Sequence, residues 1–158
     1  MSCSAGPSYT PDDIEKWSLN VNVVLDSPRG RRKFKEFLSE WDLEDDEKTL
    51  QFWEKCNALL HEAHQNKHLK KHDKAAKIHH DRFEKEAIAL VEYAEEHLNF
   101  DVAQLREFRQ IVEKKDVQQT LKVISRAQST ASYLLKSKFE LFRKKIQKEL
   151  PPLNAKKK

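Results

Sequence analysis

Apolar side chains recur along most of this chain at intervals of three and four residues, the period of a helix with one buried face. One such stripe joins Phe34, Phe37, Leu38 and Trp41, and a wider one covers residues 50–63. Further stripes of the same period lie within residues 83–98, 105–112, 117–127 and 135–146. The pattern predicts an all-α fold in which these faces bury against one another, with Phe37, Trp41, Trp53 and Phe139 in the core.

Polar residues and turn formers divide the chain between these stripes. A first helix is expected to start at Thr10, whose side chain can cap it, with Pro11 suited to its first position. Turn chemistry at residues 26–30 predicts a break, after which a helix begins near Arg31. Three further breaks are predicted, at the acidic residues 42–47, at residues 99–101 and at residues 128–130.

Composition favours helices over a sheet. The 158 residues include only 2 glycines and 5 prolines, too few for the turns of a many-stranded sheet. We therefore predict one domain, a single bundle of about nine helices over residues 12–150. Residues 1–11 and 151–158 are polar or proline-containing, so we expect flexible tails, the second of them basic.

Two features bear on where the protein works. No apolar run approaches the roughly 20 residues that span a bilayer, and the first ten residues lack the basic start and apolar centre of a signal peptide. The 2 cysteines, Cys3 and Cys56, lie far apart, and Cys56 falls on an apolar helix face, where a thiol is buried and inert. The sequence predicts a cytoplasmic protein, or one peripheral at the inner face of the plasma membrane.

Lysines gather in one short stretch. The basic surface comprises Lys67, Lys70, Lys71, Lys74 and Lys77, with Asp73 as the one acid among them. A solvated loop is the simpler interpretation, and contact with an anionic membrane or an acidic partner is the alternative. No arginine, phenylalanine, tyrosine or tryptophan separates these lysines to stack on bases, so nucleic acid is not an expected partner.

Four histidines have the spacing of one helix face. They are His61, His64, His68 and His72. Histidine pairs four residues apart can bind zinc or copper, but no cysteine or well-placed carboxylate completes a site here. We therefore predict a solvated polar face and no metal site.

Motifs for catalysis are also missing. The sequence contains no G-x-x-x-x-G-K, no G-x-S-x-G and no H-E-x-x-H, and it has too few glycines to bind a phosphate with backbone amides. We expect no cofactor and no catalytic residues, and hence no enzyme. The acidic residues 42–47 could attract a basic partner, although a solvated charge run is the simpler interpretation.

Several short motifs follow one another in an order that resembles the RGS (regulator of G-protein signalling) homology domain family. They are Trp17, Gly30, the F-K-E-F-L of residues 34–38, the F-W-E-K-C of residues 52–56, residues 74–78 and the L-L-K-S-K-F of residues 134–139. The resemblance implies a helical bundle that binds an activated Gα subunit and accelerates its GTP hydrolysis without donating a chemical group. Such an activator only stiffens the arginine and glutamine that Gα already holds.

The resemblance also implies where a Gα subunit would be contacted. In the family, three loops carry a Glu-Asn before F-W, an Asn-x-Asp segment, and an Asp-Ser pair with a nearby arginine. The corresponding residues here are Lys48, Thr49, Asn99, Ser129, Thr130 and Tyr133. Asn99 keeps the usual chemistry, whereas the other two segments have changed it.

Two functions are consistent with this pattern. The first is a divergent RGS-like interaction module in G-protein signalling that lacks GTPase-activating activity and binds Gα or another signalling protein. The alternative is an active GTPase-activating regulator of Gα subunits. The preserved core motifs and the altered contact motifs favour the module, because a fold does not fix a function.

Overall fold

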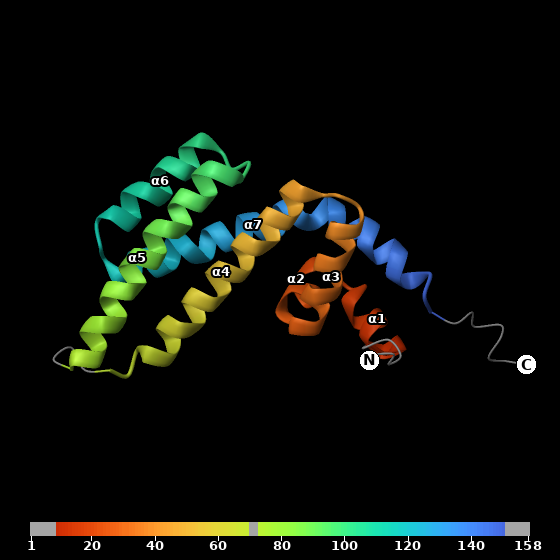
Figure 1. The fold of residues 1–158 in the computed structure, drawn as a ribbon, viewed down its shortest axis with the longest axis horizontal. Coiled ribbons are helices and arrows are strands. Elements are labelled where there is room, and N and C mark those ends of the chain that lie inside the picture. Colours follow the sequence, from red (N-terminus) through yellow and green to blue (C-terminus); the bar gives the residue numbers. More distant parts are fainter. Residues whose placement is uncertain (1–8, 70–72, 151–158) are drawn as a thin grey trace, which may run out of the picture. The chain divides into compact units, whose positions relative to one another are not determined.

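The computed structural model describes residues 9–69 and 73–150, and its backbone there is almost entirely helical (Figure 1). The helices are α1 (Pro11–Trp17), α2 (Val21–Asp26), α3 (Pro28–Glu40), α4 (Glu44–Asn66), α5 (Lys74–His97), α6 (Val102–Glu113) and α7 (Val117–Gln147). The all-α prediction is confirmed. The prediction of about nine helices is wrong, since the described ranges hold seven helices.

The first helices start at residues that cap them. The Thr10 side chain accepts a hydrogen bond from the backbone amide of Asp13, and the Asp13 carboxylate accepts one from the backbone amide of Thr10. The predicted start of α1 is therefore confirmed. Ser27 caps α3 by accepting from the Gly30 amide. This cap starts α3 at Pro28, earlier than the predicted start near Arg31, and it places Gly30 within the first turn.

Gly30 is needed because the chain crowds it. A Cβ atom at this position would lie 2.8 Å from the Val24 carbonyl oxygen and 3.0 Å from the indole nitrogen of Trp17. The contact with the backbone carbonyl leaves no flexible group to move aside. The glycine noticed in the sequence therefore permits the close approach of α2 and α3.

The acidic residues 42–47 do not form the predicted connection. Helix α4 begins at Glu44, so most of these carboxylates lie in its first turn, where the partial positive charge of a helix N-terminus stabilises them. The connection reduces to residues 41–43. It closes α3 with Asp42 in the left-handed conformation (φ 55°) and a hydrogen bond from the Leu43 amide to the Leu38 carbonyl.

Helix α7 runs unbroken through residues 128–130, so the predicted turn there is wrong. Serine and threonine favour turns because their hydroxyls compete for backbone groups, but here the hydroxyls of Thr130 and the nearby Ser132 bond within the helix. Thr130 donates to the Arg126 carbonyl at 3.2 Å, and Ser132 donates to the Gln128 carbonyl at 3.3 Å. Apolar residues on both sides of this stretch keep one helical period, which outweighs the local turn signal.

The chain divides into two compact units, which we describe separately. Unit 1 comprises the residues up to Asp46 together with those from Leu135 onward. Its core is an aromatic cluster in which the Phe142 ring lies 5.0 Å from Phe34 and 5.6 Å from Phe37. Trp41 was expected in this core, but it lies at the end of α3 with 48% of its surface exposed.

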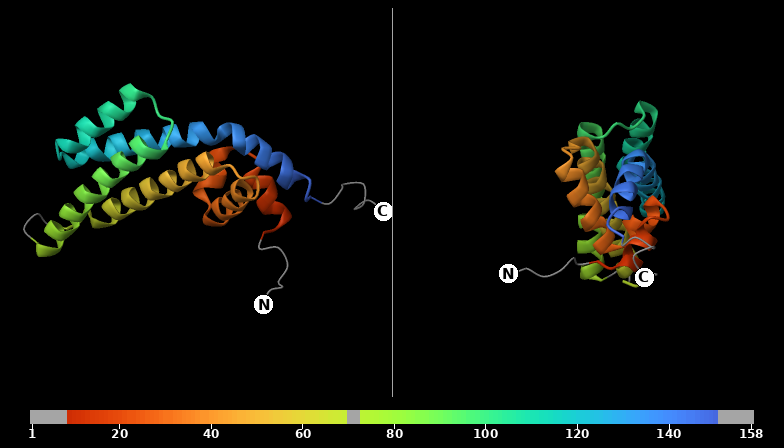
Figure 2. Two further views of the ribbon diagram at one scale, coloured as in Figure 1. Left: turned by 45° about the horizontal axis from the view of Figure 1, so that its top comes forward. Right: turned by 90° about the vertical axis from the view of Figure 1, so that its right-hand side faces the viewer.

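Unit 2 comprises residues 47–134, which include most of α4, all of α5 and α6, and the first part of α7. Helices α5 and α6 lie side by side and antiparallel, as both views show (Figures 1 and 2). Phe52 is fully buried at the centre, and the rings of Phe100 and Phe108 meet it edge to face at 5.6 Å and 6.4 Å. Such edge-to-face pairs stabilise a core beyond the area they bury.

Cys56 is buried in α4, as the apolar pattern predicted. Burial raises the pKa of its thiol far above the ordinary value, because the charged thiolate would lose its water. The thiol is therefore unreactive in the folded state. Across the described helices, none combines the length and apolarity needed to cross a membrane.

Candidate functional site

The residues predicted to contact a partner come from three segments of unit 2, and contacts between side chains hold these segments together. The Phe100 ring packs on Phe52, which links the segment between α5 and α6 to α4. The Gln104 side chain donates to the Thr130 hydroxyl at 2.8 Å, which links α6 to α7. A second hydrogen bond joins α7 to α4, from the side-chain amide of Gln128 to the Trp53 carbonyl at 3.4 Å. We call the surface formed by Lys48, Asn99, Val102, Ser129, Thr130 and Tyr133 the contact face.

The predicted residues differ in how far a partner could reach them. Asn99 and Ser129 are exposed, and Tyr133 presents 70% of its surface. Lys48 and Thr130 are half-buried. Thr49 is the exception, since only 6% of it is exposed, and its side chain offers nothing to a partner.

The segment around Asn99 is held by the residues on either side of it. Leu98 and Phe100 are both buried, so the backbone is anchored before and after Asn99. Asp101 caps α6 by accepting a hydrogen bond from the Ala103 amide at 2.9 Å. The predicted break at residues 99–101 is confirmed, and it presents the Asn99 amide group at a fixed position.

The α4 part of the contact face is supported by Tyr93 of α5. Its hydroxyl lies 3.2 Å from the Lys48 carbonyl and 2.9 Å from the side-chain oxygen of Gln51, within donating distance of each. Its ring stacks on Phe52 at 6.2 Å. Burial raises the pKa of the Tyr93 hydroxyl above its ordinary value, because the charged phenolate would lose water.

Sequence reasoning missed two residues of this site. Val102 opens α6 with 68% of its surface exposed, next to the Asn99 segment, and Gln104 supplies the bond to Thr130. Val102 lies three residues before Leu105, a spacing that continues the apolar stripe, so only the structure reveals its exposure. No pattern in the sequence pointed to Gln104, because its role depends on α7.

The basic surface lies elsewhere in unit 2. Lys67 follows the end of α4, and Lys74 and Lys77 lie in the first turns of α5, while Lys70 and Lys71 fall outside the described residues. The stretch thus joins residues that follow α4 to the first turns of α5, which begins at Lys74. Its contact with a membrane or an acidic partner stays a prediction.

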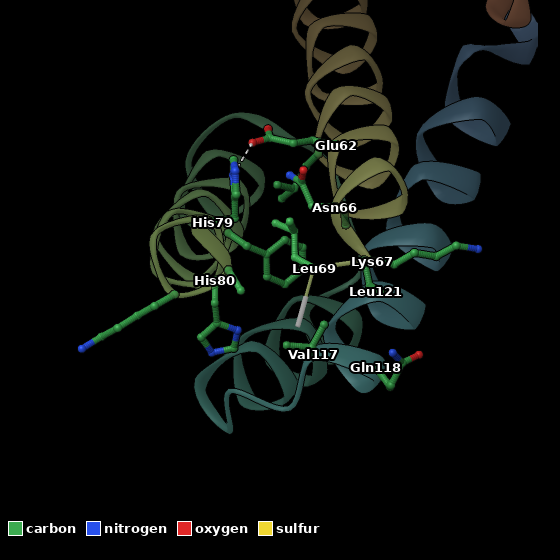
Figure 3. Close-up of a pocket in the computed structure, with 14 residues that line it drawn as sticks. Glu62, Asn66, Lys67, Leu69, His79, His80, Val117, Gln118 and Leu121 are labelled. Atoms are coloured by element: carbon green, nitrogen blue, oxygen red, sulfur yellow. Dashed lines mark ion pairs between the residues drawn. The ribbon is translucent and has the colours of Figure 1, made fainter. Parts of the chain in front are cut away.

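A pocket of about 600 Å³ adjoins this basic surface (Figure 3). Its apolar lining includes Leu59, Phe83 and Leu121, from α4, α5 and α7. The ammonium group of Lys67 points away from it (Figure 3). At its rim His79 Nδ1 is buried without a hydrogen-bond partner, 4.0 Å from a Glu62 carboxylate oxygen. Glu62, Lys67 and Lys77 also belong to the lining, so this pocket combines apolar and charged side chains.

The histidine series is not a single face. His61 and His64 lie on α4, His68 lies beyond its end, and His72 falls outside the described residues. Among residues 9–69 and 73–150, no three histidine, cysteine or acidic side chains are grouped so that they could hold a metal ion.

Comparison with known proteins gives one partial similarity. The chain is 31% identical over 65 residues to Regulator of G-protein signaling 19 from Homo sapiens. The similar region covers 41% of this chain and 29% of that protein, so the chain spans less than a third of the relative's length. No protein-family model matches the sequence, and no solved structure matches it.

Proposed function

We propose that this chain is a divergent RGS-like module that binds a protein partner of G-protein signalling through the contact face, without accelerating GTP hydrolysis. The observation that carries the proposal is the state of the three contact segments. They are joined into one surface by Phe100, Gln104 and Gln128, yet only the Asn99 segment keeps the chemistry of the family. The partial similarity to an RGS protein supports the G-protein context.

The two other segments explain why binding and activation would separate. A GTPase activator stabilises the transition state through several contacts at once, so losing two of three removes most of the differential binding. Lys48 stands where the resemblance places a carboxylate, and Thr49 is buried. Ser129 and Thr130 lie within the continuous α7, whereas the resemblance places a loop there that carries an Asp-Ser pair with a nearby arginine.

The contact face nevertheless has the composition of a protein interface. Tyr133 and Val102 are the most exposed apolar or aromatic side chains in it, and tyrosine is enriched at the centres of interfaces. Asn99, Ser129 and Thr130 supply hydrogen-bonding groups around them. A partner that brings an apolar residue and two or three polar groups would fit this surface.

The experiment that tests the proposal compares binding with activation. The purified chain is titrated against several Gα subunits loaded with GDP and with GDP plus aluminium fluoride, and single-turnover GTP hydrolysis is measured in parallel. We expect binding that Tyr133→Ala and Asn99→Ala weaken, with no change in the hydrolysis rate. Glu92→Gln, an exposed change on α5 outside the contact face, is the matched control.

The alternative is an active regulator, and it is favoured by the exposed, anchored Asn99. It predicts tight binding only in the presence of aluminium fluoride, and a saturable rate enhancement that Asn99→Ala abolishes. That result would refute the proposed non-activating module and support an active GTPase-activating regulator. Failure to bind any Gα in either state would direct the search to another signalling partner of the same face.

A further inference from the structure

Trp41 differs from the other two tryptophans of the chain. Trp17 and Trp53 are buried, whereas Trp41 is 48% exposed at the end of α3. Its position is fixed, because its ring lies 4.7 Å from Phe37 and its amide donates to the Phe37 carbonyl at 3.1 Å. An exposed tryptophan that is held rigidly loses little conformational entropy when it is covered.

Leu141 lies on α7, in the same unit as this tryptophan. It is 37% exposed, and it shares a helix face with Lys138 and Lys145, three residues before it and four after it. Lys138 pairs with Asp46 at 3.3 Å, and Lys145 pairs with Glu40 at 2.9 Å. Because these ion pairs bracket residues 41–43, Leu141 adjoins that connection. We call Trp41 and Leu141 the aromatic patch.

The charged groups that border the aromatic patch are mainly acidic. Asp42 is exposed in the connection before α4, Glu44 is exposed at the start of α4, and Lys144 is exposed on α7. The two bracketing lysines are each matched by a carboxylate, so they add no net charge. The surroundings of the patch are therefore negative, which attracts cations.

We propose that the aromatic patch is a docking surface for a basic segment of a partner protein, with an apolar or arginine side chain placed against Trp41. Tryptophan is the residue most often found at interface hot spots, and its ring also binds cations. The acids beside it select lysine- and arginine-rich partners. This surface belongs to unit 1, and its role does not depend on the proposed function.

The test uses the full chain and synthetic peptides. A helical peptide of lysine and leucine is titrated while tryptophan fluorescence is quenched with acrylamide, which reaches Trp41 far more readily than the two buried tryptophans. Two control peptides carry glutamate in place of lysine, or serine in place of leucine. We expect the lysine–leucine peptide alone to bind and to protect Trp41, with an affinity that falls as salt is raised.

Variants then locate the binding. Trp41→Ala should weaken the affinity for the lysine–leucine peptide by about tenfold. This variant lacks the fluorophore, so its binding is measured by calorimetry. The double change Asp42→Asn and Glu44→Gln should weaken peptide binding and flatten its salt dependence, with the melting temperature checked because Glu44 also stabilises the start of α4. Leu19→Ser, at another exposed apolar residue of unit 1, is the control and should leave the affinity unchanged.

Three outcomes would overturn the proposal. Equal binding of the glutamate peptide would remove the charge argument, and an equal loss in Leu19→Ser would show nonspecific adsorption. Analytical sedimentation could instead show that the free chain is a dimer and that Trp41→Ala makes it monomeric. A second copy of the chain would then cover the patch.

Discussion

The two ends of unit 2 share α4, α5 and α7, yet they pack differently. At the contact-face end, Phe52, Phe100 and Phe108 are buried in edge-to-face contact, and hydrogen bonds from Gln104 and Gln128 join the segments. At the other end α4, α5 and α7 surround a pocket of about 600 Å³. Close packing leaves one arrangement of side chains, whereas unfilled space permits several. The contact-face end is thus the part of unit 2 suited to present groups at fixed positions.

The largest expected effect tests this contrast by removing one large side chain from each end. Phe52→Ala should lower the free energy of unfolding by about 3–5 kcal/mol, because the cavity left in a close-packed core cannot collapse. Leu121→Ala, beside the pocket and half-buried, should cost less than about half as much. Urea unfolding followed by circular dichroism measures both. Equal losses would show that the two ends pack alike.

The next effect concerns the continuity of α7 beneath the contact face. Ser129→Pro should destabilise the chain by about 3 kcal/mol, because proline in a helix interior removes a hydrogen bond and clashes with the preceding turn. Ser129→Ala is the control and should be neutral or slightly stabilising. If residues 128–130 formed a turn, proline would be tolerated there. A melting temperature unchanged by Ser129→Pro would therefore indicate a turn at these residues.

A smaller effect is expected for the bond between α6 and α7. Gln104→Ala and Thr130→Val should each cost about 1 kcal/mol, and the double variant should cost little more than either one. The shortfall from additivity measures the coupling across the contact face. Fully additive losses would indicate that the side chains do not bond in solution.

Filling the space at the two ends should give effects of opposite sign. Ala63→Leu adds volume beside the pocket and should change the stability by less than about 1 kcal/mol, in the stabilising direction. The same substitution at Ala131, which is fully buried in α7, should cost about 1–3 kcal/mol through overpacking. Destabilisation of similar size by both changes would mean that the pocket closes in solution.

The smallest effect is a pH dependence on the α5–α6 pair. Two hydrogen bonds from the Arg109 guanidinium, both 2.7 Å, lower the pKa of Glu95. A lowered pKa in the folded state means that this contribution is complete above the ordinary glutamate value of about 4.3 and is lost as the pH falls through the folded value. Arg109→Gln should therefore reduce the stability near neutral pH slightly and flatten its decline in acid. An unchanged acid profile would show that solvent screens the pair.

Much of the fold could be predicted from the sequence because its signals are local and repeated. The apolar stripes placed α3 to α7, the Thr10 capping box marked the start of α1, and the Asn99 segment marked the break before α6. Two breaks were predicted wrongly for the same reason. At residues 42–47 and 128–130, polar residues that favour turns lie next to strong helical periods, and packing of those periods extended the helices through them.

The candidate site could be predicted less well. The resemblance selected positions in three segments. The structure shows that one of them, Thr49, is buried, and that Val102, which was not selected, is exposed. The bond from Gln104 to Thr130 spans 26 residues of sequence, and no local pattern indicates it. The exposure of Trp41 could not be predicted either. It lies on an apolar stripe and was therefore expected in the core, but it lies at the end of α3 and is half exposed.

The sequence by itself determined the helical class, most helix positions and the burial of Cys56, because each depends on the spacing of side chains within one segment. The tertiary structure alone decided which segments form the contact face, which apolar residues stay exposed, and where unit 2 leaves a pocket. These properties arise between segments that are distant along the chain, and they depend on how side-chain volumes fit when the segments meet.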